Sequence, residues 1–250
     1  MRKFGLIGYP LGHSFSKKFF TEKFYNEQIT DCSYENFPLT GIDQLHGLIR
    51  EETELQGLNV TIPYKSEIIK LLDNLSPEAE EIGAVNVIKI TRPDNKIVLT
   101  GFNSDVTGIR DSLVPFLKDY VKSALILGSG GSSCAVSYFL RKSGIDFNIV
   151  SRSRKEGAIA YSDLSSGLLR DTYLIINTTP LGMFPDLNTK PDIDYSLLGS
   201  KHILFDLVYN PQETLFLKYG IQQGCTVIKG INMLNSQAEK SWEIWNDKSL

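Results

Sequence analysis

The chain has 250 residues, of which 42% are hydrophobic and 22% are charged, so it is long enough to bury the core of one large domain or two small ones. The formal net charge is −3 and no basic run exceeds a few residues, which argues against nucleic acid or an anionic membrane surface as a partner. The three cysteines and three histidines are scattered, which is typical of a reducing compartment and indicates no metal site.

The first ten residues, "MRKFGLIGYP", lead into a predicted strand and lack the apolar stretch of a signal peptide. No later apolar run is long enough to span a membrane, so we expect a cytoplasmic protein. Strands are predicted in the first part of the chain at residues 4–8, 33–37, 57–62, 84–90 and 97–100. Helices are predicted between them at residues 16–28, 42–51, 66–72 and 77–82. Such alternation is typical of an α/β fold with a mainly parallel sheet.

A linking helix is predicted from Thr107 to about Leu117, and a second alternating series follows it. The predicted strands of this series are residues 124–127, 147–150, 173–177, 203–207 and 226–228. Its predicted helices are residues 132–142 and 211–223. The last segment, "INMLNSQAEKSWEIW", has apolar residues at helical spacing. We therefore predict two α/β domains that meet near residue 105, with a terminal helix, residues 231–250, that could pack on either.

A glycine-rich loop in "ALILGSGGSSCAV" joins a predicted strand to a predicted helix. Gly128, Gly130 and Ser133 fit the pattern G-x-G-x-x-G, with serine in place of the third glycine. Gly128 would permit the tight turn, Gly130 would let a pyrophosphate approach the backbone, and the helix N-terminus would offer unpaired N–H groups. The loop therefore predicts a dinucleotide site, and an ordinary strand-to-helix turn is the alternative.

Cations follow the next predicted strand, residues 147–150. An NAD-binding fold usually carries Asp or Glu about twenty residues beyond the glycines, to hold the ribose 2′-hydroxyl. Here no acid is present, and a 2′-phosphate would be stabilised instead. The pattern favours NADP(H) over NAD, and a solvated basic turn is the alternative. The segment consists of Ser151, Arg152, Ser153, Arg154 and Lys155.

Four short stretches of the first half carry polar side chains beside predicted strands. Each has an ordinary explanation when taken alone, such as helix capping by Ser16 or Asp105, or a solvated Lys65. Together they lie at or near strand ends, where open α/β sheets bind ligands, and their chemistry suits a polyhydroxylated acid. The residues are Ser14, Ser16, Asn59, Thr61, Lys65, Asn86, Asn103 and Asp105.

The order of motifs along nearly the whole chain resembles the shikimate dehydrogenase family. The shared motifs, besides the glycine loop, are S-x-S (14–16), N-V-T-x-P-x-K (59–65), G-A-V-N (83–86), N-x-D (103–105), N-T-T-P-x-G-M (177–183), D-x-x-Y-x-P-x-x-T (206–214) and G-x-x-M-L-x-x-Q (230–237). Family members reduce 3-dehydroshikimate to shikimate with NADPH, reversibly, in aromatic amino-acid biosynthesis.

The resemblance implies an N-terminal α/β substrate domain, residues 1–105, and a C-terminal Rossmann-type NADP-binding domain, residues 106–230, with a cleft between them. The terminal helix, residues 231–250, would return to the first domain. The protein would bind a small-molecule substrate. The sequence does not decide between a monomer and a homodimer.

The resemblance also implies roles for individual residues. Lys65 would be the proton donor and Asp105 its coupled partner, and the two would form the catalytic pair. The substrate-binding residues would be Ser14, Ser16, Asn59, Thr61, Lys65, Asn86, Asp105, Tyr209 and Gln237. The cofactor-binding residues would be Gly128, Ser129, Gly130, Gly131, Ser132, Ser151, Arg152, Arg154, Asn177, Thr178, Thr179, Gly230 and Met233. Arg152 would lie on the 2′-phosphate.

Three alternative functions stay open. One is a quinate/shikimate dehydrogenase of broader specificity, which acts on the 1-hydroxylated acid and could use NAD; the basic turn after Val150 argues against NAD dependence. Another is a dinucleotide-binding sensor without turnover, against which the retained Lys65 and Asp105 argue. The third is a related dehydrogenase acting on a folate or an amino acid, and the pair Ser14 and Ser16 favours shikimate over it.

The chain departs from the family pattern in three places. Lys17 and Lys18 stand where a proline is usual, and Val106 stands where a glycine commonly follows the aspartate. The segment between Arg154 and Tyr161 is short. This length predicts that the helix after the second strand of the second domain is reduced or missing.

Overall fold

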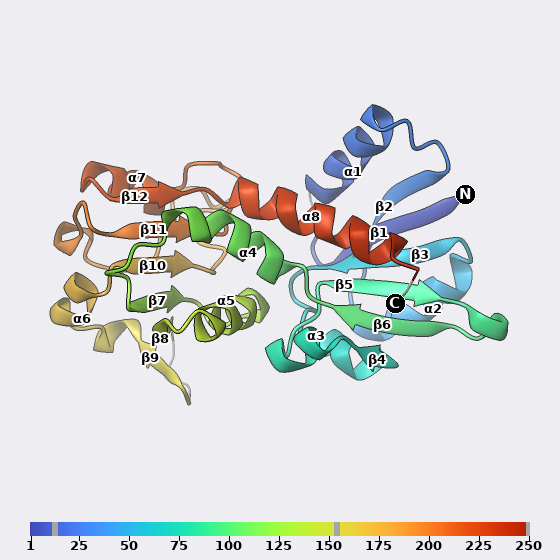
Figure 1. Ribbon diagram of the computed structural model, residues 1–250, viewed down its shortest axis with the longest axis horizontal. Coiled ribbons are helices and arrows are strands. Elements are labelled where there is room, and N and C mark those ends of the chain that lie inside the picture. Colours follow the sequence, from blue (N-terminus) through green and yellow to red (C-terminus); the bar gives the residue numbers. More distant parts are fainter. Residues whose placement is uncertain (12–14, 153–155, 249–250) are drawn as a thin grey trace. The chain divides into compact units, whose positions relative to one another are not determined.

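A computed structural model describes residues 1–11, 15–152 and 156–248 of the chain. The chain divides into two compact units. Unit 1 comprises Met1–Ser104 and Gln237–Leu250, and unit 2 comprises Asp105–Ser236. Each unit is built around its own six-stranded sheet, with helices alternating with the strands (Figure 1). The predicted α/β class is thereby confirmed.

The sheet of unit 1 has the strand order β2-β1-β3-β5-β6-β4. β1 pairs in parallel with β2 and β3, and β4 pairs in parallel with β6. β5 runs antiparallel to both of its neighbours, so the sheet is mainly parallel except around β5. The strands are β1 (Arg2–Gly8), β2 (Cys32–Pro38), β3 (Leu55–Val60), β4 (Asn74–Leu75), β5 (Val87–Thr91) and β6 (Val98–Phe102).

Helices cover both faces of this sheet. They are α1 (Phe15–Asn26), α2 (Leu45–Glu51), α3 (Pro77–Ile82) and the C-terminal part of α8 (Gly230–Asn246), together with the 3₁₀ helices η1 (Ile42–Gln44), η2 (Glu67–Leu71) and η3 (Pro93–Asn95). One face packs against α2, η2 and α3 through aliphatic side chains that include Ile49, Ile68 and Ala79. Apolar residues three or four positions apart make these short helices one-sided, which is why each buries one face.

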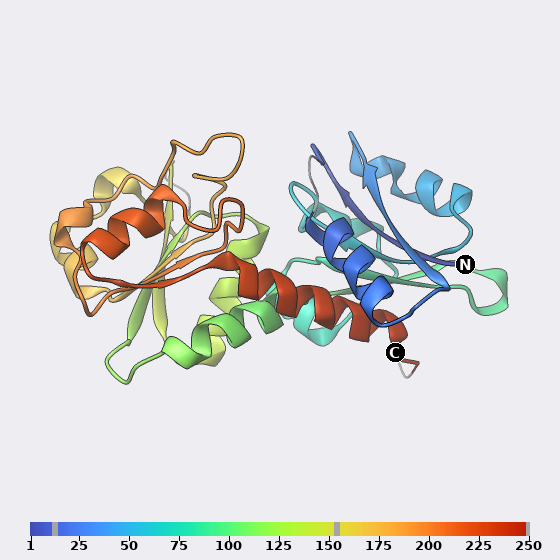
Figure 2. The same ribbon diagram turned by 90° about the horizontal axis from the view of Figure 1, so that it is seen from above.

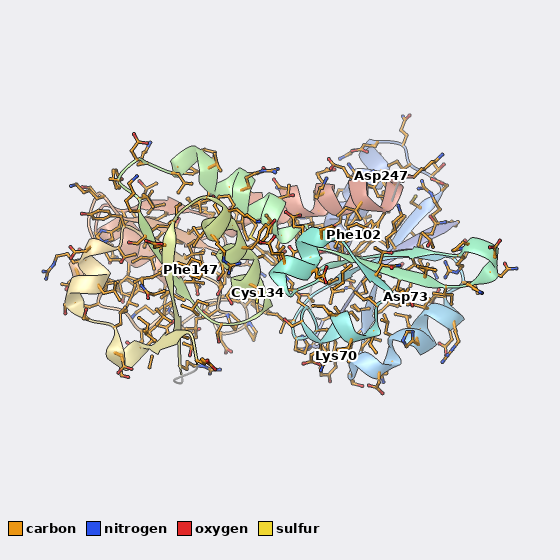
Figure 3. The ribbon with its side chains drawn as sticks, turned by 60° about the horizontal axis from the view of Figure 1, so that its bottom comes forward. Lys70, Asp73, Phe102, Cys134, Phe147 and Asp247 are labelled. Atoms are coloured by element: carbon orange, nitrogen blue, oxygen red, sulfur yellow. The ribbon has the colours of Figure 1, made fainter. Side chains whose placement is uncertain are left out.

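The other face of the sheet packs against α1 and α8 through aromatic rings. The Trp245 ring stacks on Phe4 with ring centroids 4.8 Å apart, and the Trp242 ring lies 5.3 Å from that of Phe24. Figure 2 shows α1 and the C-terminal part of α8 next to each other in unit 1. Phe102 and Asp247 belong to this region, and both are labelled in Figure 3. The Phe102 ring packs in the same hydrophobic cluster as these aromatic rings. The Asp247 carbonyl accepts a hydrogen bond from Lys89 Nζ. The end of α8 is therefore anchored on the first sheet.

The sheet of unit 2 has the order β12-β11-β10-β7-β8-β9, and its neighbouring strands pair in parallel. Sequences such as "ALIL" and "LII" form its centre, because a parallel sheet is buried on both faces and needs apolar residues on each. The strands are β7 (Ser123–Leu127), β8 (Asp146–Ser151), β9 (Ala158–Ala160), β10 (Leu174–Asn177), β11 (Ile203–Asp206) and β12 (Thr226–Ile228).

The helices of unit 2 are α4 (Asp105–Leu113), α5 (Gly131–Lys142), α6 (Ser166–Asp171), α7 (Leu215–Gln222) and the start of α8, with the 3₁₀ helices η4 (Val114–Phe116), η5 (Tyr161–Asp163) and η6 (Tyr195–Leu197). α4 and α8 approach so closely that a Cβ at Gly108 would collide with the Met233 carbonyl. Within the described part of the chain, the helices do not combine the length and apolar character that a membrane crossing needs.

Several predicted boundaries were wrong, for identifiable reasons. β3 ends at Val60 rather than at residue 62, because the chain turns there and the Tyr64 N–H bonds back to the Thr61 carbonyl. β5 begins at Val87 rather than at residue 84, since the left-handed Gly83 (φ 71°) ends α3 and the chain rejoins the sheet only afterwards. α7 begins at Leu215 rather than at residue 211, because Thr214 caps it by accepting the Leu217 N–H.

Other elements were missed or differ in type. β4, β9 and α6 were not predicted, because segments of two to six residues contain too little periodicity to be recognised. The segment predicted as a helix at residues 66–72 is the 3₁₀ helix η2. In the shortened region, residues 156–160 contain a turn and then β9 in place of a helix, as the segment length predicted.

Candidate active site

Unit 1 contains a buried cluster of amide and hydroxyl side chains. Asn59 lies on β3, Asn86 just before β5, Ser104 just after β6, and Gln237 and Ser241 lie on α8; each is at most 8% exposed. Buried polar groups need hydrogen-bonding partners. The five side chains supply these partners to one another, and we call them the amide–hydroxyl cluster.

Asn86 lies at the centre of the amide–hydroxyl cluster. Its Oδ1 accepts the backbone N–H of Ser104 at 2.7 Å, and its Nδ2 donates to Ser104 Oγ at 3.0 Å and to Gln237 Oε1 at 3.4 Å. The Asn86 backbone N–H donates to the Phe102 carbonyl, and its own carbonyl accepts the Val60 N–H. The fold thus brings together two predicted substrate-binding residues, Asn86 and Gln237.

Asn59 lies beside Asn86 and is held from three sides. Its Nδ2 donates to Ser241 Oγ at 2.9 Å and to the Asn86 carbonyl at 3.3 Å, and its Oδ1 accepts from the Tyr34 hydroxyl at 2.8 Å. Both amide hydrogens are therefore used within the protein. Sequence reasoning did not find Tyr34, Ser104 or Ser241, because no motif contains Tyr34 or Ser241 and Ser104 was the unassigned middle residue of N-x-D.

Ser16, in the first turn of α1, bonds to this network through Tyr34. Burial raises the pKa of the Tyr34 phenol well above its usual range, and the hydrogen bond with Ser16 opposes that rise. Tyr34 is therefore neutral near pH 7, and its proton is available to Asn59. Ser14, the other predicted carboxylate-binding serine, lies outside the described residues.

The segment carrying Thr61 and Lys65 is fastened by its backbone. The Lys65 carbonyl accepts the Val85 N–H at 2.7 Å, next to Asn86, and the Thr61 N–H donates to the Ile7 carbonyl at 2.9 Å. The Lys65 side chain is half-buried in the turn between β3 and η2. The position of its backbone is thus independent of what its ammonium contacts.

Asn103 and Asp105 follow β6. Asn103 Nδ2 donates to the Ala84 carbonyl at 2.9 Å, which ties the end of β6 to the segment before β5. Asp105 is buried and is the first residue of α4, where a carboxylate complements the positive end of the helix dipole. The Asn103 amide therefore holds two segments of unit 1 together. The catalytic role of Asp105 stays a prediction.

The glycine loop of unit 2 follows β7. Gly128 has φ 112°, and a Cβ there would lie 2.7 Å from Thr178 Oγ1, which itself donates to the Leu127 carbonyl. Only glycine fits this conformation and this close approach. At Gly130, which precedes α5, a Cβ would meet nothing within 4 Å. The backbone is therefore open at Gly130, immediately before α5, and this glycine loop at a helix N-terminus fits a pyrophosphate.

Further residues of the predicted cofactor site lie at the start of α5 and at the end of β8. Ser133, which replaces the third glycine of the pattern, donates from Oγ to the Gly130 carbonyl at 2.6 Å. Ser151 is buried at the end of β8, and Arg152 after it is exposed. Arg154 lies outside the described residues. Burial raises the pKa of Tyr161 to about 12 despite the opposing charge of Arg152, so the Arg152 guanidinium lies within electrostatic reach of Tyr161.

Asn177 is held at the end of β10 by a buried carboxylate. Its Nδ2 donates to Asp206 Oδ1 at 2.9 Å, and its Oδ1 accepts from both the N–H and the Oγ1 of Thr179. Asp206 also accepts from Val208 N–H at 3.0 Å and from Thr214 Oγ1 at 2.5 Å. The predicted residues Asn177 and Thr179 are thus oriented by Asp206 and, indirectly, by Thr214. Asp206 and Thr214 are the first and last residues of the motif D-x-x-Y-x-P-x-x-T, but the spacing of the motif gave no role to either.

Three further predicted residues lie near this network. Tyr209 is half-buried, and burial raises its pKa. A Cβ at Gly230 would lie 2.8 Å from the Asp206 carbonyl and 2.7 Å from the Leu207 carbonyl, so glycine is required where α8 begins. Met233 is buried on α8 one turn later. The starting position of α8 is therefore set by the end of β11.

Known proteins resemble this chain over nearly its whole length. Residues 6–88 match the family model described as the shikimate dehydrogenase substrate binding domain. A protein of Methanococcus aeolicus named shikimate dehydrogenase (NADP(+)) is 36% identical over 264 residues, which cover 96% of this chain and 90% of that protein.

Solved structures of proteins with that name also resemble this chain. Shikimate dehydrogenase 1 from Peptoclostridium difficile is 38% identical with a TM-score of 0.83, covering 100% of this chain and 94% of that one. Shikimate 5-dehydrogenase from Thermus thermophilus, in complex with NADP(H) and shikimate, is 29% identical with a TM-score of 0.84, covering 98% and 94%. The identities of 36% and 38% along nearly the full length of both chains, together with the family model, establish common descent. The chain belongs to the shikimate dehydrogenase family.

Proposed function

We propose that this protein is an NADP-dependent shikimate dehydrogenase, which reversibly reduces 3-dehydroshikimate to shikimate. The observation that carries this proposal is the similarity to proteins of that name along nearly the whole chain, which includes both units. Unit 1 would bind the substrate, because it contains the amide–hydroxyl cluster, Ser16 and Lys65. Unit 2 would bind NADP(H), because its glycine loop and the start of α5 fit a pyrophosphate.

In unit 1 the substrate-binding residues would be Ser14, Ser16, Asn59, Thr61, Asn86 and Gln237, with Tyr209 contributing from unit 2. Amides and hydroxyls both donate and accept, which suits a ring with several hydroxyl groups. Gly128 to Ser132 would contact the pyrophosphate, and Arg152, with Arg154, would contact the 2′-phosphate. Asn177, Thr178, Thr179, Gly230 and Met233 would lie along the cofactor.

The proposed chemistry needs one proton donor from the protein. When bound, NADPH would supply a hydride to the carbonyl carbon of the substrate. Lys65 donates a proton to the carbonyl oxygen as negative charge develops there, and in the reverse direction it accepts that proton. Asp105 orients the Lys65 ammonium and accepts a hydrogen bond from a substrate hydroxyl. The two side chains act as one coupled acid–base pair.

A steady-state assay tests this function directly. Reduction of NADP or NAD is followed at the nicotinamide absorbance band with shikimate or quinate as the second substrate. We expect the largest kcat/KM for shikimate with NADP. A larger value for quinate would favour the broader quinate/shikimate dehydrogenase. If the protein binds NADP but turns over neither shikimate nor quinate with either cofactor, the result would favour a dinucleotide-binding sensor without turnover.

Arg152 tests the assignment of the cofactor. Arg152→Ala should raise the KM for NADPH and lower the preference for NADPH over NADH roughly tenfold, because an exposed charge-assisted bond to the 2′-phosphate is lost. The KM for NADH should stay nearly constant, since NADH lacks that phosphate. Arg170→Ala removes an exposed arginine of α6 in the same unit and is the matched control. An unchanged preference would point to Arg154 or Lys155 in place of Arg152.

A further inference from the structure

The orientation of Gln237 follows from a single backbone group. The Ser104 backbone N–H can only donate, so the Asn86 side-chain atom 2.7 Å from it is the oxygen Oδ1. The other end of that amide is then the donor Nδ2, and the Gln237 atom that it contacts must be the acceptor Oε1. Ser104 Oγ also lies 3.3 Å from Gln237 Oε1. The Nε2 group of Gln237 therefore points away from the amide–hydroxyl cluster.

Gln237 consequently offers donors to a ligand. Its Nε2 makes no hydrogen bond to any residue in the described part of the chain, although the residue as a whole is only 8% exposed. A buried amide that keeps two N–H groups unused is suited to an acceptor oxygen, such as a substrate hydroxyl. Small shifts of α8 would move these donors, so the placement of α8 matters for binding.

Ser241 connects α8 to the sheet one helical turn beyond Gln237. It is completely buried, and its Oγ accepts from Asn59 Nδ2 at 2.9 Å and lies 3.2 Å from Ser104 Oγ. The same hydroxyl donates to the Gln237 carbonyl at 2.8 Å. Residues four apart lie on the same face of a helix, so Ser241 and Gln237 face the amide–hydroxyl cluster together. One hydroxyl thus joins β3, the end of β6 and the backbone of Gln237.

The orientation of Asn59 is likewise determined. The Asn86 carbonyl can only accept, so the Asn59 atom facing it is Nδ2, which leaves Oδ1 for the Tyr34 hydroxyl. Asn59 therefore directs a donor at Ser241, and no rotation of its amide gives an equivalent set of bonds. Loss of the Ser241 hydroxyl would leave a buried N–H without its partner.

We propose that Ser241 is a positioning residue for substrate binding, which acts by holding Gln237 with its N–H donors directed at the substrate. The proposal rests on the proposed function, because shikimate is the ligand used to measure it. Ser241 itself need not contact the substrate, since its hydroxyl is occupied by Asn59 and by the Gln237 carbonyl. None of the motifs that indicate the family includes Ser241.

The test compares Ser241→Ala with the wild type in the shikimate assay. We expect the KM for shikimate to rise about tenfold, because one buried hydrogen-bonding partner is removed, while the KM for NADP stays within about twofold. Ser112→Ala is the matched control, since Ser112 on α4 is equally buried but its Oγ has no hydrogen-bond partner within the described residues. The control should keep both KM values.

A double-mutant cycle separates positioning from general loosening of the protein. If Ser241 acts through Gln237, Ser241→Ala should raise the KM much less in a Gln237→Ala background than in the wild type. Ser104→Ala is a second variant, which removes the neighbouring hydroxyl but keeps the backbone N–H that holds Asn86. It should raise the KM for shikimate several-fold and show the same dependence on Gln237.

Two results would overturn the inference: the same shikimate KM for Ser241→Ala and Ser112→Ala, or additive effects of Ser241→Ala and Gln237→Ala. If Ser241→Ala is recovered unfolded, the Ser104→Ala cycle decides by the same two criteria. Failure of the proposed function is distinguishable, because it would show as a wild-type protein without shikimate turnover.

Discussion

Lys65→Ala is expected to lower kcat by a factor of about 10²–10⁴, the range typical of a lost general acid–base group, and to change the KM for shikimate much less. Proton transfer contributes mainly in the transition state, so its loss should appear in kcat and kcat/KM together. The backbone at this position should persist, because the Lys65 carbonyl is held by Val85 N–H whatever the side chain. Steady-state kinetics in both reaction directions measure the effect.

Lys70→Ala is the control for this prediction. Lys70 is an exposed lysine of η2 five residues further along the chain, and it is labelled in Figure 3. Its removal changes the net charge by the same amount and should leave kcat and KM unchanged. A large rise in KM with constant kcat in Lys65→Ala would reassign Lys65 to substrate binding. Asp105→Asn should lower kcat in the same way, since the two residues are proposed to act as a pair.

Asp206→Asn is expected to remove a pH dependence of stability. Asp206 is completely buried, and burial raises its pKa to about 6, although the hydrogen bonds from Thr214, Val208 and Asn177 oppose this. In the unfolded chain an aspartate titrates near about 3.9. Between about pH 4 and pH 6 the unfolded state has lost this proton and the folded state still holds it. The stability of the wild type should therefore fall as pH rises through this window and then level off above it.

The size of this effect follows from the two pKa values. The pKa of Asp206 is about 2 higher in the folded protein than in the unfolded chain, which lowers the unfolding free energy by roughly 3 kcal/mol at neutral pH. Asparagine does not titrate, and its Oδ1 can still accept from Val208 and Asn177. The variant should therefore gain stability relative to the wild type between pH 4 and pH 7 by an amount on the order of 2–3 kcal/mol. Chemical denaturation followed by circular dichroism at pH 4, 5, 6 and 7 measures the difference.

Asp171→Asn provides the comparison for this experiment. Asp171 is exposed at the end of α6 in the same unit, so burial cannot contribute there. A difference between Asp206→Asn and the wild type that stays constant from pH 4 to pH 7 would contradict the prediction. If the variant also shows a raised KM for NADP, Asp206 acts on the cofactor through Asn177, whose amide it orients.

Much of the architecture was predictable because the signals are local. The apolar runs of β7 and β10 indicated a buried parallel sheet, and the glycine loop between β7 and α5 stands where its pattern required. The short β4 and β9 were not predictable, since two or three residues contain no period. The end of β3 and the start of β5 were misplaced, because turns without a regular period, such as the one closed by Tyr64 N–H and the Thr61 carbonyl, decide where each strand stops or begins.

The sequence by itself determined the α/β class and the family, since residue type and order along the chain carry that information, and it proposed the site residues. Only the tertiary structure decided what those side chains bond to. Asn59 and Ser241 are 182 positions apart, and Asn177 and Asp206 are 29 apart, so neither bond has a local signature. Hydrogen-bond direction in a buried cluster depends on which backbone N–H and C=O groups face it, and those groups meet only when the sheet and its helices have packed.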